Sequence, residues 1–229
     1  MGILLLPAMI FAFYAQYKVN KTYDTYSKVL AKCNLPANEV SRQILERNRA
    51  TVSIMQTKGH LTDNYNPINK EIRLSQSVYA STSVAAIGVA AHETGHALQD
   101  AKNYFPMKVR HAVIKLSNFA SSLLIPLLAL GTMFWFVLAG SLIGEVFIWV
   151  GVGLFALGAL ANLVTLPVEV NASNRAVAAL KETHLLEEDE LQSVKQVLRA
   201  AALTYVASLA ISLLGLLRLI FFFVATSDK

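Results

Sequence analysis

Three long apolar stretches constrain the fold of this chain more than any other feature of its sequence. They cover approximately residues 119–143, 146–166 and 201–225. Glu145 is the only charged residue between Lys115 and Glu169, and about 20 apolar residues suffice to cross a bilayer as a helix. The composition agrees, because 55% hydrophobic residues, 15% charged residues and a mean hydropathy of +0.47 are unusual in a soluble domain. The sequence therefore predicts a mainly α-helical, polytopic membrane protein.

The first 17 residues are a fourth candidate span, since none of them is charged. No basic segment precedes the apolar residues and no cleavage site with small residues is evident. We therefore predict a retained first transmembrane helix, with a cleaved signal peptide as the alternative. The last stretch contains Arg218, whose side chain can snorkel to the interface. The predicted organisation is a transmembrane helix at 1–17, a polar segment at 18–118, a transmembrane hairpin at 119–167, a polar helical segment at 168–200 and a fourth transmembrane helix at 201–225.

The distribution of positive charge predicts how these four spans are oriented. Residues 18–118 contain 14 Lys or Arg and residues 168–200 contain four, whereas the termini and the hairpin tip contain only Lys229 beyond Arg218. Positive segments stay in the cytoplasm, so both polar segments should lie there, near one face of the plasma membrane. The net charge of +5 needs no nucleic acid to explain it, because anionic lipids of the inner leaflet attract such segments.

The first polar segment contains the pentapeptide His92-Glu93-Thr94-Gly95-His96. A helix over about residues 83–101 is predicted, because small apolar residues precede the motif and Ser81, Thr82 and Ser83 are candidate N-caps. Residues four apart share a helix face, so His92 and His96 can bind one metal ion. Glu93 can then act as general base toward a water that the ion activates, which is typical of zinc hydrolases. The alternative is a buried helix with two hydrogen-bonded core histidines.

A catalytic zinc needs a third protein ligand and an open position for water. Glu169 is the best candidate, since Pro167 suits the start of a helix and would place Glu169 in its first turn. A carboxylate at the end of an apolar stretch needs a helix N-terminus or a cation as its partner. The alternative is a carboxylate that only stabilises the helix start. The prediction is one zinc ion per chain, bound by His92, His96 and Glu169.

Two strands are predicted before the zinc helix, at residues 51–55 and 71–75, with a turn signal at 66–69. They would form a small β-hairpin or sheet within a zincin-like domain. Two interpretations stay open. The edge of the second strand could hold an extended peptide substrate by backbone hydrogen bonds, or a plain hairpin could cover the helix.

Several motifs together resemble the YugP-type neutral zinc metallopeptidases, a family of bacterial membrane proteases. They are Ala90-Ala91-His92-Glu93-Thr94-Gly95-His96-Ala97, Leu166-Pro167-Val168-Glu169 through Ala172-Ser173, Ala200-Ala201-Ala202-Leu203-Thr204-Tyr205, and Tyr65-Asn66-Pro67 before Arg73-Leu74-Ser75. More distantly the chain is similar to HtpX and CAAX-processing membrane proteases, where a Glu-x-x-Ala-Asp motif supplies the third ligand. The resemblance implies that Glu169 is this ligand. Ser173 stands where those relatives have an Asp that orients a ligand histidine, and a serine could still donate one hydrogen bond.

Three functions are compatible with these residues. The first is a membrane-bound zinc metalloendopeptidase that faces the cytoplasm and hydrolyses peptide bonds of membrane or membrane-proximal proteins. The second is an intramembrane, site-2-like protease, which the absence of Asp from the later spans and the basic flanks of the zinc helix disfavour. The third is an inactive membrane scaffold with a structural metal site, which would not require Glu93. We predict the first.

The oxyanion formed during peptide hydrolysis needs a second electrophile besides zinc. Arg175, Tyr205 and His184 are candidates in that order, and each has an alternative role as a surface or interfacial residue. The expected partners are the lipid bilayer and a protein or peptide substrate, without nucleic acid. A homo-oligomer or a regulatory membrane partner leaves no mark in the sequence.

Overall fold

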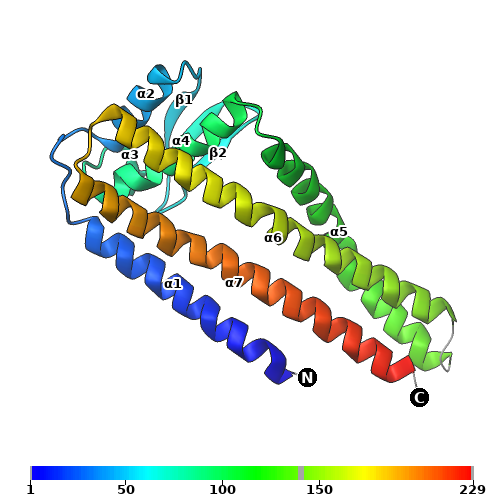
Figure 1. Ribbon diagram of the computed structural model, residues 1–229. Coiled ribbons are helices and arrows are strands. Elements are labelled where there is room, and N and C mark those ends of the chain that lie inside the picture. Colours follow the sequence, from blue (N-terminus) through cyan, green and yellow to red (C-terminus); the bar gives the residue numbers. More distant parts are fainter. Residues whose placement is uncertain (1, 139–141, 228–229) are drawn as a thin grey trace. The chain divides into compact units, whose positions relative to one another are not determined.

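The computed structural model describes residues 2–138 and 142–227, which are mainly helical with a small mixed sheet (Figure 1). After a 3₁₀ turn at Gly2–Leu5, the elements are α1 (Leu6–Tyr26), α2 (Ala37–Arg47), β1 (Ser53–Thr57), β2 (Asn64–Asn66), β3 (Glu71–Ser75), α3 (Gln76–Tyr79), α4 (Val84–Ala101), α5 (Phe105–Val137), α6 (Leu142–Thr183) and α7 (Glu188–Ser227). The predicted class, a mainly helical chain with long apolar helices and a small sheet, is confirmed.

Among the described residues, α5, α6 and α7 are long and apolar enough to cross a membrane. Of the predicted first span, residues 1–17, Met1 lies outside the described residues, residues 2–5 form the 3₁₀ turn and residues 6–17 begin α1, which does not meet that criterion of length and composition. A fourth span therefore stays a prediction. Contacts divide the chain into two compact units. The span unit comprises Met1–Phe13, Lys108–Leu166 and Tyr205–Lys229, and the HExxH unit comprises Tyr14–Met107 and Pro167–Thr204.

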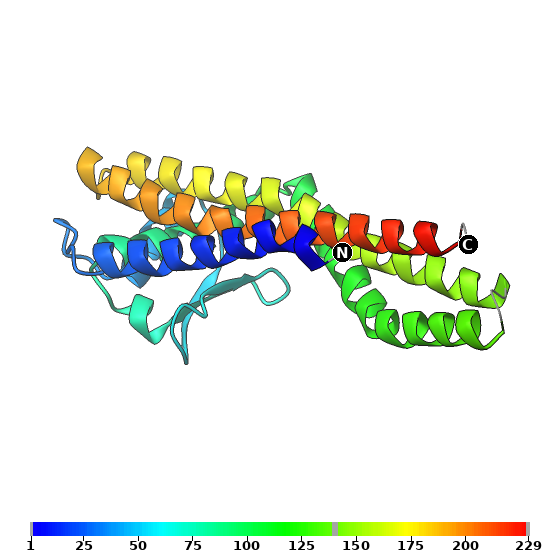
Figure 2. The same cartoon turned by 90° about the horizontal axis from the view of Figure 1, so that it is seen from below.

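Within the span unit, α5 and the first half of α6 are antiparallel neighbours (Figure 2). Glycines allow the close approach of the two helices. A Cβ atom added at Gly144 would lie 2.6 Å from the backbone nitrogen of Trp135, which is far closer than van der Waals contact. Such small residues are typical of helix contacts in membranes, where backbones pack closely.

Pro167 does not begin a helix, and this prediction was wrong. α6 passes through Pro167 without interruption, so Glu169 lies in the second half of a 42-residue helix rather than in a first turn. An interior proline costs a helix about 3 kcal/mol. Residues just beyond it are buried, Val168 completely and Glu169 to 2% exposure, and this packing offsets the cost. Glu169 thus has no helix N-terminus as its partner.

The core of the HExxH unit surrounds α4. Ser83 caps this helix, since its hydroxyl accepts a hydrogen bond from the backbone N–H of Ala86 at 3.2 Å. The predicted helix over residues 83–101 is therefore confirmed. Nearly every face of α4 is buried, and its apolar residues share one core with α2, the end of α6 and the beginning of α7, including Ile44, Ile87, Leu180 and Val194.

The sheet differs from the predicted hairpin. Its strand order is β1-β3-β2, with β1 parallel and β2 antiparallel to β3. The segments predicted as strands thus correspond to β1, shifted by two residues, and β3, but they run in the same direction. The hairpin is instead β2–β3, whose turn begins where the Asn66 side chain accepts a hydrogen bond from the Ile68 amide. β3 is the central strand, so its edges are already paired and cannot hold a substrate.

Candidate metal centre

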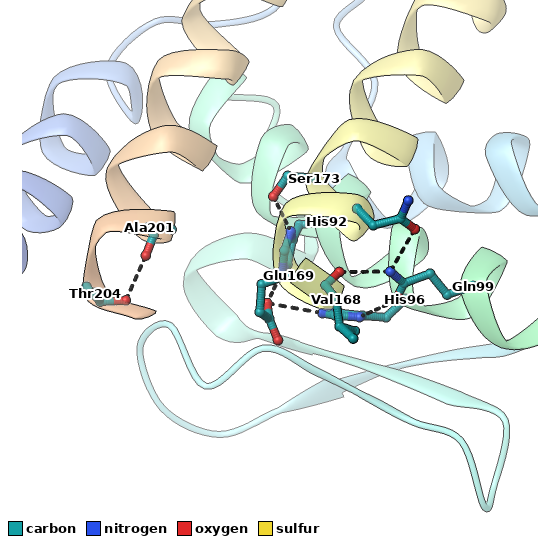
Figure 3. A network of polar contacts seen from close by, with 9 residues as sticks. His92, His96, Gln99, Val168, Glu169, Ser173, Ala201 and Thr204 are labelled. Atoms are coloured by element: carbon teal, nitrogen blue, oxygen red, sulfur yellow. Dashed lines mark hydrogen bonds and ion pairs between the residues drawn. The ribbon is translucent and has the colours of Figure 1, made fainter. Parts of the chain in front are cut away.

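Three predicted ligands come together from two helices that are distant in the sequence. His92 and His96 lie on α4 and Glu169 on α6, and one ligand atom from each lies within 4.8 Å of the others. Glu169 Oε2 is 3.1 Å from His92 Nε2 and 3.4 Å from His96 Nε2 (Figure 3). Glu169 is only 2% exposed, and a buried carboxylate needs compensating positive or hydrogen-bonding groups.

The close approach of α4 to α6 depends on Gly95, which lies between the two histidines. A Cβ atom added at Gly95 would lie 2.3 Å from the carbonyl oxygen of Ala172. That distance is too short for any side chain, and backbone atoms cannot move aside as a flexible side chain can. A glycine at the second variable position of the pentapeptide motif is therefore a requirement of packing, because the helices must touch for Glu169 to reach the histidines.

Hydrogen bonds from outside the cluster hold both imidazole rings. His92 Nδ1 lies 3.1 Å from the hydroxyl of Ser173, and His96 Nδ1 lies 3.0 Å from Gln99 Oε1 (Figure 3). When a histidine binds a metal through Nε2, its Nδ1 carries the hydrogen and donates it outward. Ser173 would then accept a hydrogen bond from His92, rather than donate one as the sequence analysis expected.

The orientation of Gln99 identifies which nitrogen of His96 carries the hydrogen. Gln99 Nε2 donates to the carbonyl of Val168 at 2.8 Å and to Asn171 Oδ1 at 3.0 Å. Asn171 Oδ1 is an acceptor because it also accepts from Arg175 Nε at 2.8 Å. Gln99 Oε1 must then accept from His96 Nδ1–H. In a neutral imidazole, this leaves a bare Nε2 lone pair facing the Glu169 carboxylate.

Two acceptors that face each other at 3.4 Å repel unless a proton or a cation lies between them. A metal ion suits this position. Around a tetrahedral zinc with bonds of about 2.0–2.1 Å, ligand atoms lie roughly 3.3 Å apart. The Glu169 carboxylate oxygen lies 3.1 and 3.4 Å from the two histidine nitrogens, and all three ligand atoms lie within 4.8 Å of one another. Two histidines and one carboxylate are also a donor set that catalytic zinc uses. The residues present therefore fit a zinc ion.

Glu93 lies beside this cluster and is almost fully buried, with 8% exposure. Burial raises the pKa of Glu93 to about 7. The negative charges of Glu169 and Asp63 act in the same direction, while His92 and the backbone amide of Tyr65 oppose it. A carboxyl group with a pKa near neutrality can both accept and release a proton under physiological conditions.

Arg175, predicted to stabilise the oxyanion, lies near the cluster, but its side chain contacts Asn171 and Tyr104. Its Nε donates to Asn171, and its guanidinium carbon lies 5.4 Å from the centre of the Tyr104 ring. Arg175 therefore belongs to the hydrogen-bond chain that runs through Asn171 and Gln99 to His96. A role toward the oxyanion stays a prediction.

The other two oxyanion candidates lie elsewhere. His184 follows the last residue of α6 with a positive φ of 55°, and fifteen residues of helix, about 22 Å, separate it from Glu169. It is not brought to the cluster. Tyr205 belongs to the span unit, where it lines a pocket between α5, α6 and α7. Its proposed catalytic role stays a prediction.

Gln99 and Asn171 are site residues that the sequence analysis missed. A signal for Gln99 was present, because a polar residue three positions after a ligand histidine shares its helix face. Asn171 gave no comparable signal, since its contact joins residues 72 positions apart in the sequence.

The fold and the cluster together define a class of protein. A chain with three candidate membrane helices, and with His-Glu-x-x-His on a buried helix facing a carboxylate, is a membrane protein with a metallohydrolase-type site. The family model described as "Putative neutral zinc metallopeptidase" matches residues 1–224, and the chain belongs to this family.

A curated relative supports this assignment. The chain is 40% identical over 227 residues to the "Putative membrane protease YugP" of Bacillus subtilis (strain 168), and the alignment covers 99% of this chain and 97% of the relative. No solved structure matches this chain. The resemblance inferred from the motifs is confirmed.

Proposed function

We propose that this chain is a membrane-bound zinc endopeptidase that cleaves membrane or membrane-proximal proteins. The observation that carries the proposal is the convergence of His92, His96 and Glu169 beside a buried Glu93. A structural zinc site would need the ligands but not this fourth, acidic residue. Membership of a zinc metallopeptidase family supports the same function.

In the proposed reaction, a zinc ion bound by His92, His96 and Glu169 supplies Lewis-acid chemistry at the cluster. Glu93 accepts a proton from the attacking water as that water adds to the peptide carbonyl. The same carboxyl group then returns the proton to the nitrogen of the leaving amine. Gln99 and Ser173 hold the two imidazole rings in the orientation that ligation requires.

The substrate backbone would lie along β2 rather than β3. β2 is an edge strand of the described sheet and contacts α4. The Tyr65 hydroxyl anchors it by donating to Asp100 near the end of α4 at 2.6 Å. Burial and the neighbouring Asp100 carboxylate raise the pKa of Tyr65, so the hydroxyl keeps its proton. An extended peptide paired with β2 would pass close to Glu93, whose charge the Tyr65 backbone amide stabilises.

The positive charges of residues 18–118 and 168–200 support a site on the cytoplasmic side of the plasma membrane. The structure disfavours the intramembrane alternative, since α4 is not among the three candidate spans of the described chain. The inactive scaffold with a structural metal is the competing function that experiment must exclude.

The test is cleavage of a fluorogenic protein, such as labelled casein, by the detergent-purified chain. Removing a general base typically lowers a rate by about 10²–10⁴-fold, so Glu93→Gln should lose at least about 100-fold in rate while keeping its zinc. Glu46→Gln on the exposed face of α2 is a matched control, and its rate should equal that of the parent. Equal rates for Glu93→Gln and the parent would overturn the proposal.

A further inference from the structure

The span unit contains a pocket, lined by both apolar and polar side chains, that the proposed chemistry does not use. It lies between α5, α6 and α7 and has a volume of about 540 Å³, which is within the usual range of ligand sites. More than half of its lining residues are polar, including two asparagines, Asn118 and Asn162. Polar groups between membrane helices are costly and commonly mark functional sites.

Four of these polar side chains have no protein partner. Among the described residues, no hydrogen bond is made by the side chains of Ser117, Asn118, Asn162 or Ser208. Other pocket hydroxyls behave differently, since Thr165 donates to the carbonyl of Ala161 on its own helix at 2.7 Å. An amide without a partner costs several kcal/mol in hydrocarbon. Asn118 and Ser208 are exposed and Ser117 and Asn162 are half-buried, so all four groups are open to a polar occupant.

The pocket reaches into the part of the helices that is expected to cross the bilayer. Asn162 lies five residues inside the span predicted to end at residue 167, and Ser208 lies seven residues inside the span predicted to begin at 201. At 1.5 Å per residue, these positions are about 8 and 10 Å from the span ends, within a hydrocarbon core of about 30 Å. The occupant must therefore carry hydrogen-bonding groups below the membrane surface.

We propose that the pocket binds the unwound end of a transmembrane segment of a protein substrate, an inference that rests on the proposed peptidase function. Asparagine amides offer donors and acceptors together, and so does a peptide backbone. The first four N–H and last four C=O groups of any helix lack partners within the helix. If such a helix end lay below the membrane surface, its free N–H and C=O groups and the asparagine amides of the pocket would form hydrogen bonds with one another.

A phospholipid fits less well. Its headgroup lies at the membrane surface, and the acyl chains that reach the depth of Asn162 and Ser208 have neither donors nor acceptors for the pocket amides. Of the described residues that line the pocket, Arg110 alone is charged, so an acidic side chain next to the substrate helix suits the pocket better than a basic one. α6 supplies residues both to this pocket and to the metal cluster.

Two glycines of α6 provide a matched test. At Gly158, which lines the pocket, an added Cβ would meet only the Ser117 hydroxyl, at an ordinary contact distance of 3.8 Å. A larger side chain there would enter the pocket without forcing the backbone. At Gly153, an added Cβ would meet nothing within 4 Å, and this residue is exposed outside the pocket. Gly158→Leu should therefore fill the pocket, while Gly153→Leu adds the same side chain elsewhere.

The probe is a synthetic transmembrane peptide with about 20 apolar residues and a photoreactive benzophenone residue at its acidic end. It is cross-linked in lipid nanodiscs to chains that also carry Glu93→Gln, so the readout does not require cleavage. Gly158→Leu should lower the cross-linking yield about tenfold, which corresponds to roughly 1.4 kcal/mol of binding. Gly153→Leu should cross-link as the parent does, and both variants should unfold at similar temperatures.

Equal cross-linking by Gly158→Leu and Gly153→Leu would overturn the proposal. A second result would also overturn it. Native mass spectrometry would find a co-purified phospholipid in the parent but not in Gly158→Leu, while both chains cross-link the peptide equally. Asn118→Leu with Asn162→Leu is a second variant, which removes the hydrogen bonds without filling the pocket and should also lower the yield. A failure of the peptidase function would appear separately, as an absence of cleavage by the chain that retains Glu93.

Discussion

Hydrogen bonds to Gln99 and Ser173 determine the orientation of the two imidazole rings and which ring nitrogen faces Glu169. Arg175 and Gln99 both donate to Asn171 Oδ1, so Gln99 Oε1 is left to accept from His96, which places the hydrogen of His96 on Nδ1. The Nε2 atom is thereby left to face a buried carboxylate. The sequence identified the two histidines and Glu169, because spacing and an unusual carboxylate are visible in it. It could not identify Asn171, whose contact arises only when α6 packs against α4.

The raised pKa of Glu93 predicts that the stability of the folded chain depends on pH. The pKa is 4.5 for an unperturbed carboxyl group and about 7 in the folded chain, so the folded state binds more protons between these values. Stability of the metal-free chain should therefore fall as pH rises from about 4.5 to 7, by about 3 kcal/mol. Glu93→Gln removes this penalty and resembles the protonated residue in shape.

Thermal unfolding of chelator-treated protein in detergent measures this effect. Glu93→Gln should unfold at a higher temperature than the parent at pH 8, and the two midpoints should converge near pH 4.5. A difference between the midpoints that is the same at both pH values would contradict the assignment of a raised pKa to Glu93.

At the scale of elements, the site depends on the contact between α4 and α6. The bounds of α4 followed from its cap and its small apolar residues. The continuity of α6 did not, because Pro167 is a strong local signal for a helix start, and only burial on both sides of the proline keeps the helix intact. A small sheet was predicted correctly, but the pairing of its strands was not, for a similar reason. A parallel pairing of β1 with β3 is a long-range contact, and β2 has only three residues, too few for a periodic pattern.

Gly95 and Gly88 on α4 give a test of the helix contact. A Cβ at Gly95 meets the backbone oxygen of Ala172 at 2.3 Å, whereas at Gly88 it meets the Val194 side chain at 3.3 Å. Gly95→Ala should push the helices apart, weaken zinc binding by at least about tenfold and destabilise the chain. Gly88→Ala needs only a small side-chain shift and should bind zinc as the parent does. Competition with a zinc chelator measures both, and equal affinities would contradict the close approach.

At the scale of the whole molecule, the membrane spans were predicted from the length of the apolar stretches, and their orientation from the positive charges. Three of the four predicted spans correspond to helices that are long and apolar enough to cross a membrane, because hydrocarbon thickness sets a length that can be counted in the sequence. α1 remained ambiguous, since it continues past the apolar residues to Tyr26. Sidedness depends on the positive residues alone, and it can be tested without knowing the substrate.

The single cysteine, Cys33, reports on this sidedness. If the HExxH unit is cytoplasmic, a membrane-impermeant maleimide should label Cys33 only after cells are permeabilised. In a Cys33→Ser background, a cysteine placed at the exposed Leu142, at the start of α6, should be labelled in intact cells. Labelling of Cys33 in intact cells would place the site on the outer side.

The most direct measurement is the zinc content of the purified chain beside His92→Ala and Glu169→Ala, with Glu46→Gln as a control. We expect about one zinc per chain in the parent and the control. Both ligand variants should lose the ion while they remain folded. Zinc retained at the parent level in Glu169→Ala, or no zinc in a well-folded parent after supplementation, would contradict a metal centre formed by α4 and α6.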